Sequence, residues 1–138
     1  MFNNKNIFRL LIGLSVIGIF LASYLFYNFL TKPMLESCYV NSIVNCDAVT
    51  KGSLSTILGV PVSIVGLIGY IVILIAALLK RKNIILLMST FGMLFCLYIT
   101  IQEVFFLKVI CPVCLSCQLV MLCIFILSLK LKFKPKNK

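Results

Sequence analysis

Four apolar runs constrain this chain more than any other feature of its sequence. They cover about residues 7–30, 60–79, 84–107 and 110–129. About 20 helical residues cross a bilayer core of roughly 30 Å, and backbone polar groups in lipid must be satisfied within a helix. The sequence therefore predicts an all-α membrane protein. Its single domain, residues 1–138, would be a bundle of four transmembrane helices.

The first run has a second interpretation, as a secretory signal peptide. It is long for that role, and no clear small-x-small cleavage site follows it. We therefore expect a retained helix. Hydrophobic residues make up 62% of the chain and charged residues 12%, which excludes an ordinary soluble domain of this size.

The basic residues lie on one side of this four-helix topology. Ten of the thirteen lie at or before the start of the first run, fill the turn between the second and third runs, or form the tail: Lys5, Arg9, Lys80, Arg81, Lys82, Lys130, Lys132, Lys134, Lys136 and Lys138. The long loop, about residues 31–59, carries two basic and two acidic residues. The positive-inside rule then predicts cytoplasmic termini, a basic cytoplasmic tail at 130–138 and an outward-facing loop. This placement argues against nucleic acid as a partner.

Two cysteines open the fourth apolar run. Cys111 and Cys114 are three residues apart, so they share a helical face within bonding reach. The free N–H groups and the dipole at a helix N-terminus stabilise a thiolate, and Pro112 fits a first helical turn. We predict a redox-active dithiol here. Two buried packing residues are the alternative.

A second pair, Cys38 and Cys46, lies in the outer loop. Disulfides form and persist outside the cytoplasm, which agrees with a location inferred from hydropathy and charge alone. The pair is either a static disulfide that holds the loop or a shuttle that exchanges electrons with a soluble partner and with the helix-four pair. We favour the shuttle.

The remaining cysteines give weaker signals. Cys117 extends the pattern to C-x-x-C-x-x-C, which raises an iron–sulfur or zinc site as an alternative. The chain has no histidine and no placed fourth ligand, so we expect no metal. Cys96 and Cys123 fall mid-membrane and are interpreted, with Cys117, as small packing residues.

Two further features belong to the outer side. Leu54, Ile57 and Leu58 fall on one helical face and predict a short amphipathic segment on the membrane surface. Glu103 is the one acidic residue within a predicted membrane helix, about two turns before Cys111. It either extends to the interface or supplies a proton or a polar contact to a bound ligand.

With both cysteine pairs in view, the chain resembles the vitamin K epoxide reductase family in its small bacterial or archaeal form. The resemblance covers about residues 11–129. The matching residues are Cys38, Cys46, Asp47, Val49, Leu58-Gly59-Val60-Pro61, Gly66, Gly69-Tyr70 and the segment Ile110-Cys111-Pro112-Val113-Cys114-Leu115-Ser116. The two pairs in this order, with this spacing to Gly-Val-Pro, are more specific than the C-x-x-C alone.

The resemblance implies a four-helix bundle around a quinone and a role for each matched cysteine. Cys114 would face the quinone, with Cys111 as its disulfide partner. Cys46 would exchange with Cys111, and Cys38 would meet an external thiol protein. The implied function is a quinone-dependent thiol-disulfide oxidoreductase that reoxidises an extracytoplasmic thioredoxin-fold oxidase. Menaquinone and ubiquinone from the membrane pool are the expected oxidants, ahead of vitamin K epoxide.

Two departures from the family pattern qualify these implications. Gly52 stands where many relatives have a serine, with Ser53 next, so a hydrogen bond from that serine to the quinone is in doubt. Many bacterial relatives also carry a fused thioredoxin-like domain. Here a lysine-rich tail follows the fourth run, so we expect the partner to be a separate protein. In the absence of histidine, we expect the helix N-terminus to activate the thiol, with Lys108 as a further candidate.

Two alternatives stay open. One is the other four-helix, quinone-linked family of membrane disulfide generators, whose C-x-x-C lies in the first outer loop rather than at the start of helix four. The second is a non-enzymatic membrane protein with a structural loop disulfide. It would keep Cys38 and Cys46 permanently joined and Cys111 and Cys114 inert.

Overall fold

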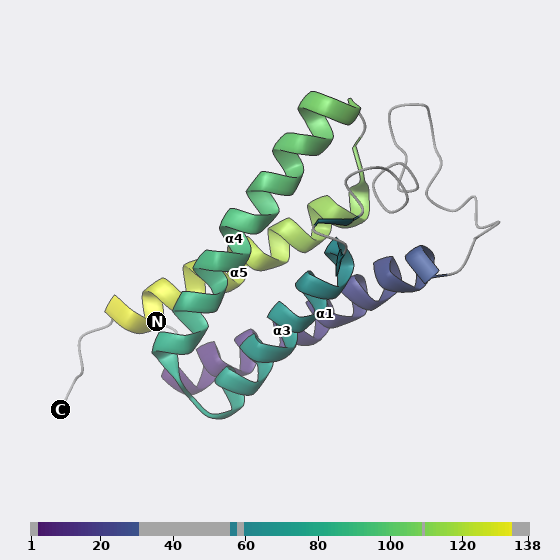
Figure 1. Cartoon of the computed structure of the whole chain (residues 1–138). Coiled ribbons are helices and arrows are strands. Elements are labelled where there is room, and N and C mark those ends of the chain that lie inside the picture. The colour runs from purple at the N-terminus through teal and green to yellow at the C-terminus, as the bar shows by residue number, and fades with distance from the viewer. Residues whose placement is uncertain (1–2, 31–55, 58–59, 109, 134–138) are drawn as a thin grey trace.

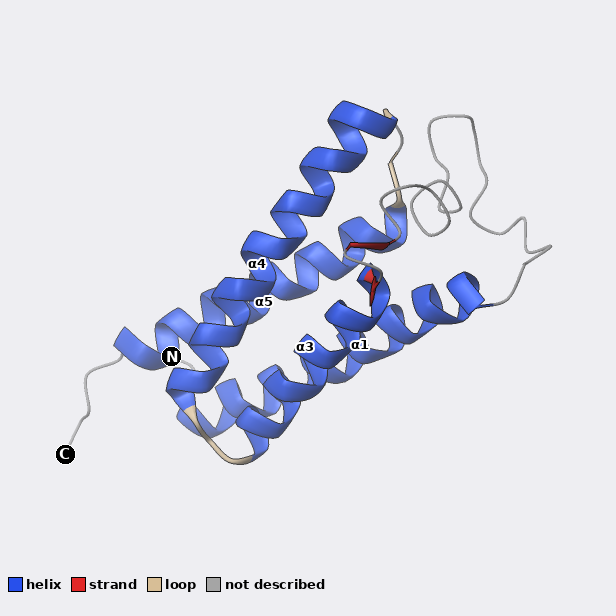
Figure 2. Cartoon of the chain, viewed as in Figure 1, coloured by secondary structure: helices blue, strands red, loops and turns tan. Residues whose placement is uncertain are grey.

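The computed structural model describes residues 3–30, 56–57, 60–108 and 110–133. They form four helices, α1 (Asn4–Leu30), α3 (Val62–Leu78), α4 (Lys82–Gln102) and α5 (Pro112–Phe133), shown in Figure 1. A π-helical turn, η2 (Glu103–Leu107), extends α4, and two short strands, β1 (Thr56–Ile57) and β2 (Val60–Pro61), precede α3. The predicted four-helix, all-α architecture is confirmed (Figure 2).

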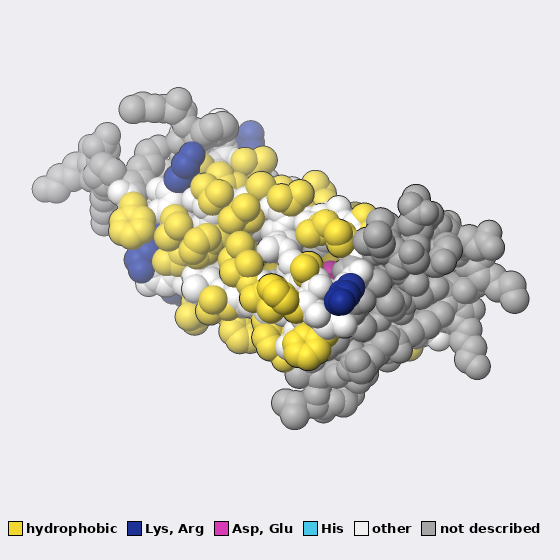
Figure 3. Space-filling view, turned by 90° about the horizontal axis from the view of Figure 1, so that it is seen from above, with side chains coloured by type: hydrophobic (Ala, Val, Ile, Leu, Met, Phe, Trp, Pro, Cys, Tyr) yellow, Lys and Arg dark blue, Asp and Glu magenta, His cyan; other side chains and the backbone are white. Residues whose placement is uncertain are grey.

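The four helices close into a ring. α1 packs against α3 and α5, and α4 packs against the same two helices. The buried residues of α1 recur every three or four positions, which places them on one helical face. They are Ile7, Leu11, Ser15, Gly18, Ala22 and Leu25. The hydrophobic core therefore follows the axis of the bundle. Many large apolar side chains are exposed on its outside, and Figure 3 shows them on one face.

Three of the helices are long and apolar enough to cross a membrane: α1, α4 with its π-helical extension, and α5. α3 is apolar but has 17 residues, which is the lower limit for a span. It begins two residues later than the sequence predicts, because Val60 and Pro61 pair with β1 and Pro61 supplies the N-cap. The exposed apolar side chains of all four helices are those that lipid would contact.

A short antiparallel pairing stands in part of the segment predicted to be an amphipathic helix. Thr56 pairs with Pro61, and Ile57 pairs with Val60. The helical prediction is therefore wrong at Thr56 and Ile57, where the backbone pairs with Pro61 and Val60 instead. Leu54 and Leu58, the other members of that predicted face, lie outside the described residues.

The α3–α4 turn lies at the same end of the bundle as the start of α1 and the end of α5, whereas α5 begins at the opposite end (Figure 1). In this turn Lys80 has a left-handed backbone (φ 55°). Its N–H donates to the Ala77 carbonyl at 3.2 Å, and the Arg81 N–H donates to the Ala76 carbonyl at 2.9 Å. These two bonds form a Schellman motif that ends α3. The basic turn thus lies beside the ends that carry the other basic segments, as the charge pattern predicts.

Candidate thiol site at the head of helix α5

Cys111 occupies the cap position of α5. The helix begins at Pro112, and the Leu115 N–H donates to the Cys111 carbonyl at 3.1 Å. The Cys111 side chain is fully buried, and its Sγ accepts the Cys114 backbone N–H at 3.5 Å. A sulfur at this position takes the place of the oxygen that usually caps a helix. The predicted helix-terminal environment for a reactive thiol is therefore present.

Cys114 lies one turn into α5 and is half-buried. Its side chain lies within hydrogen-bonding range of the Cys111 side chain. It also lines a cavity of about 270 Å³ between the helices. The pair therefore has two different surroundings, with one sulfur enclosed and the other at the edge of a hollow.

The cavity is lined mainly by apolar side chains from all four helices. α1 contributes Ala22 and Leu25, and α4 contributes Phe91 and Phe95, whose rings stack with centroids 6.5 Å apart. Its volume is just below the range of roughly 300–1,000 Å³ that is typical of ligand sites. Six of its lining residues carry a hydroxyl or thiol group: Ser63, Tyr70, Cys96, Thr100, Cys114 and Cys117. The hollow suits a flat apolar ring that carries few polar atoms.

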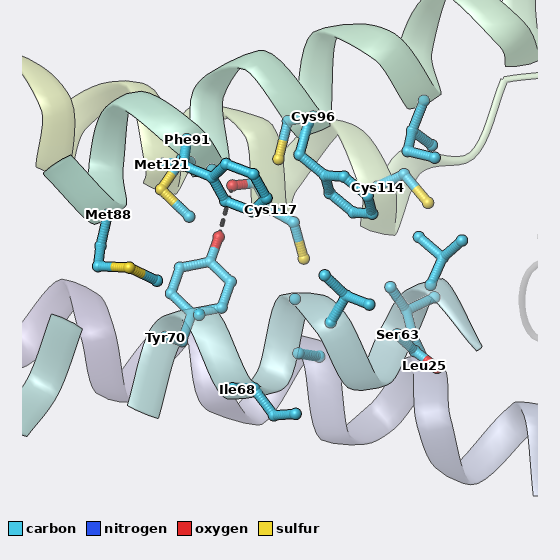
Figure 4. Close-up of a pocket in the computed structure, with 18 of the residues that line it drawn as sticks. Leu25, Ser63, Ile68, Tyr70, Met88, Phe91, Cys96, Cys114, Cys117 and Met121 are labelled. Carbon is cyan, nitrogen blue, oxygen red and sulfur yellow. Dashed lines mark hydrogen bonds between the residues drawn. The ribbon is translucent and has the colours of Figure 1, made fainter. Parts of the chain in front are cut away.

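Tyr70 links α3 to α5 at this cavity. Its side chain is 2% exposed, and its hydroxyl donates to the Cys117 carbonyl oxygen at 2.8 Å (Figure 4). On the other side of its ring, a Cβ added to Gly18 would collide with the ring atoms. Tyr70 is thus held between α1 and α5. Figure 4 shows Cys96, Cys114 and Cys117 on the α4 and α5 side of the same hollow.

A second polar link joins α4 to α5. Thr100 Oγ1 lies 2.9 Å from the Cys96 carbonyl oxygen and 2.6 Å from Gln118 Oε1. Farther along the same helix pair, the hydroxyls of Ser89 and Ser128 are 3.1 Å apart. Side-chain hydrogen bonds of this kind hold membrane helices in register where lipid offers no competing partner.

Glu103 is buried beside the cysteine pair. It begins the π-helical turn η2, and its side chain is 2% exposed. Its carboxyl group lies within hydrogen-bonding range of the Cys114 side chain and the Cys111 backbone. Of the two interpretations of Glu103, extension to the interface is excluded by this burial. The proximity of this carboxyl group to the thiols was not predicted from the sequence.

The other predicted site residues fall into three groups. Cys38 and Cys46 lie outside the described residues, so their pairing and their role stay predictions. Lys108 is exposed and ends η2 with a left-handed backbone. Among the described residues, no group of three or more histidine, cysteine or acidic side chains is arranged to hold a metal ion.

Tyr70 and Thr100 line the cavity and were not predicted from the sequence to do so. Tyr70 had been noted only as part of a matching motif, and Thr100 had not been singled out. Both are hydroxyl-bearing residues within apolar helices, which is a signal for an interhelical hydrogen bond. Cys96 and Cys117 were interpreted as packing residues, and the structure places them on the cavity wall. Cys123 is exposed on α5.

The fold and the site together define a class: a membrane protein with a dithiol at the head of a helix, beside an apolar cavity. The chain belongs to the vitamin K epoxide reductase family, whose model matches residues 9–129. No individual curated protein matches it. Membership makes the protein a membrane oxidoreductase of thiols and disulfides.

Proposed function

We propose that the protein is a quinone-dependent thiol-disulfide oxidoreductase that reoxidises an extracytoplasmic thioredoxin-fold oxidase. One observation carries the quinone part of this proposal. Cys114 shares the first turn of α5 with Cys111 and also lines an apolar cavity among the membrane helices. A lipid-soluble oxidant that enters this hollow would meet a thiol of the pair.

The proposed reaction balances without any further reactant. The Cys111 and Cys114 thiols lose two electrons and two protons and form one disulfide bond. The quinone gains both electrons and both protons and becomes the quinol. The quinone supplies the driving force, since each 30 mV in a two-electron step corresponds to about 1.4 kcal/mol.

Cys38 and Cys46 complete the proposed electron route. A reduced partner would reduce the Cys38–Cys46 disulfide, and Cys46 would then exchange with Cys111. The charge distribution supports the orientation in which these steps take place outside the cytoplasm and both termini lie within it.

Quinone reduction by the purified full-length protein in detergent tests this function. A reduced dithiol donor drives the reaction, with menaquinone and ubiquinone analogues as separate acceptors. The variants are Cys111→Ser and Cys114→Ser. Cys123→Ser is the matched control, because Cys123 is on the same helix but exposed. We expect the first two variants to fall to the background rate and the control to keep wild-type activity.

The contrary result is equally specific. If the wild type reduces no quinone, or if the rate is indifferent to Cys111 and Cys114, the quinone proposal fails. A permanently closed Cys38–Cys46 disulfide in the same preparations would then favour the non-enzymatic alternative. If the proposal holds, Cys46→Ser should accumulate a mixed disulfide between Cys38 and the thioredoxin-fold partner, identifiable by mass spectrometry.

A further inference from the structure

Glu103 is a buried carboxyl group that packing alone does not explain. Its side chain is 2% exposed, and its Oε1 has no hydrogen-bond partner among the described residues. A buried polar atom without a partner costs free energy, and an ionisable residue within a membrane span is a candidate functional group. Glu103 is also the only acidic residue in the described part of the chain.

The position of Glu103 relative to the thiols is specific. The carboxyl group lies within hydrogen-bonding range of the Cys114 side chain and the Cys111 backbone. It stands where α4 changes from α-helical to π-helical geometry. Single π-helical turns in α-helices are frequent at functional sites.

The chemistry of the pair requires a proton acceptor. A thiol must lose its proton before its sulfur can attack, because the thiolate is the nucleophile. The chain contains no histidine, and Lys108 is exposed. Among the described residues, Glu103 is the group that lies close to the thiols and has an oxygen without a hydrogen-bond partner, which could accept a proton.

We propose that Glu103 accepts the proton of the Cys114 thiol when the Cys111/Cys114 pair is oxidised, which makes it a catalytic residue of the reaction proposed above. The S–H bond of Cys114 breaks, and the proton passes to a Glu103 carboxylate oxygen. The electron pair stays on sulfur for the oxidation step. Glu103 then releases this proton to the reduced product, so it ends the cycle unchanged. This role rests on the proposed function for its oxidant, although the deprotonation itself does not.

Two substitutions separate proton transfer from positioning. Glu103→Gln keeps the shape and an oxygen that can accept the same hydrogen bond, but it cannot take a proton. Glu103→Asp keeps the carboxylate on a shorter side chain. A general base typically raises the rate of the catalysed step by 10²–10⁴-fold. We expect Glu103→Gln to lower kcat for quinone reduction by about 100-fold or more while the KM for quinone changes less than about twofold.

Rescue by aspartate and a neighbouring control complete the series. We expect Glu103→Asp to reduce quinone at least about tenfold faster than Glu103→Gln does. Gln102→Ala, at the adjacent half-buried position, should behave like the wild type. A purely structural role would give the opposite order, with the near-isosteric glutamine better tolerated than the shorter aspartate. That order would overturn the proposal, as would a glutamine variant of wild-type kcat.

A second reaction tests the base without quinone. The reduced protein is mixed with 4,4′-dithiodipyridine. The Cys114 thiolate displaces one thiopyridone, and Cys111 displaces the second as the intramolecular disulfide closes. Mass spectrometry of the peptides identifies which cysteines have reacted. We expect Glu103→Gln to slow the reaction at Cys114 and to leave Cys123 unaffected. Equal rates at Cys114 in both proteins would overturn the inference even where quinone reduction succeeds. A slowed rate would support it even where quinone reduction fails.

Discussion

The Tyr70 hydroxyl donates a 2.8 Å hydrogen bond to the Cys117 carbonyl oxygen, so one side chain of α3 joins the backbone of α5 beside the cavity. Tyr70 and Cys117 both line that cavity. The spacing between α3 and α5 at this level is therefore fixed by a specific polar contact as well as by apolar packing.

Removal of this hydroxyl should weaken the bundle without removing the redox pair. We expect Tyr70→Phe to lower the free energy of unfolding by about 1 kcal/mol, the usual net value of one hydrogen bond, and to retain quinone reduction. SDS titration in mixed micelles measures the change. Tyr98→Phe is the control, because Tyr98 is an exposed tyrosine on α4. Equal stability of the two variants would show that the bond contributes nothing.

The contact between Gly18 and Tyr70 makes a sharper test of packing. A Cβ at Gly18 would collide with the ring, whereas nothing lies within 4 Å of the equivalent atom at Gly13 on the same helix. We expect Gly18→Ala to destabilise the protein by roughly 1–3 kcal/mol, which is typical of overpacking. Gly13→Ala should be neutral or slightly stabilising, because alanine is the better helix former. The same titration compares them, and a reversed order would contradict the packing of α1 against α3.

The two other cysteines of the cavity should not be essential for turnover. Cys96 and Cys117 lie within helices, away from the free N–H groups at the head of α5. We expect Cys96→Ala and Cys117→Ala to keep quinone reduction within about threefold of wild type while losing some stability to the void that each leaves. A loss of tenfold or more in steady-state rate for Cys117→Ala, in protein that is still folded, would instead assign that thiol a redox role.

The Schellman motif after α3 predicts a stabilising substitution. Lys80 adopts a left-handed backbone (φ 55°), which costs a residue with a side chain roughly 1 kcal/mol and costs glycine little. We expect Lys80→Gly to raise the free energy of unfolding by up to about that amount. Lys82→Gly, at the first position of α4, should be neutral or destabilising. A loss of stability in Lys80→Gly would indicate that the side chain has a contact that outweighs its backbone.

Much of the bundle could be predicted from the sequence because lipid imposes a simple rule on apolar segments. The four helices and the position of Pro112 in the first turn of α5 follow from hydropathy and from proline geometry. The spacing of residues along α4 also indicates which of its faces points into the bundle. Ile85, Ser89, Ile99 and Glu103 are buried. The half-buried Gly92 and Cys96 lie between Ser89 and Ile99, so this face follows steps of three or four residues. That pattern places Glu103 inside the bundle rather than at its surface.

Other features depended on contacts that no local pattern carries. Glu103 and Cys114 are on different helices. The π-helical turn and the left-handed backbone of Lys108 lie between these helices and set how the chain passes from α4 to α5. The bond from Tyr70 to Cys117 joins residues 47 positions apart. At Thr56 and Ile57 the local pattern fitted a helix as well as a strand, and pairing with Val60 and Pro61 decided between them.

The scarcity of polar groups around the cavity has a consequence for selectivity. The Tyr70 hydroxyl and Thr100 are already engaged with the backbone or with Gln118, which leaves few donors among the described residues to distinguish one ring carbonyl from another. An apolar pocket separates analogues that differ by a methylene by only about 10- to 200-fold. For an oxidant dissolved in the bilayer, the concentration that the pocket meets is the concentration in lipid rather than in water. The composition of the host membrane would then decide which ring the protein uses, and the same chain placed in another membrane would change its oxidant without changing a residue.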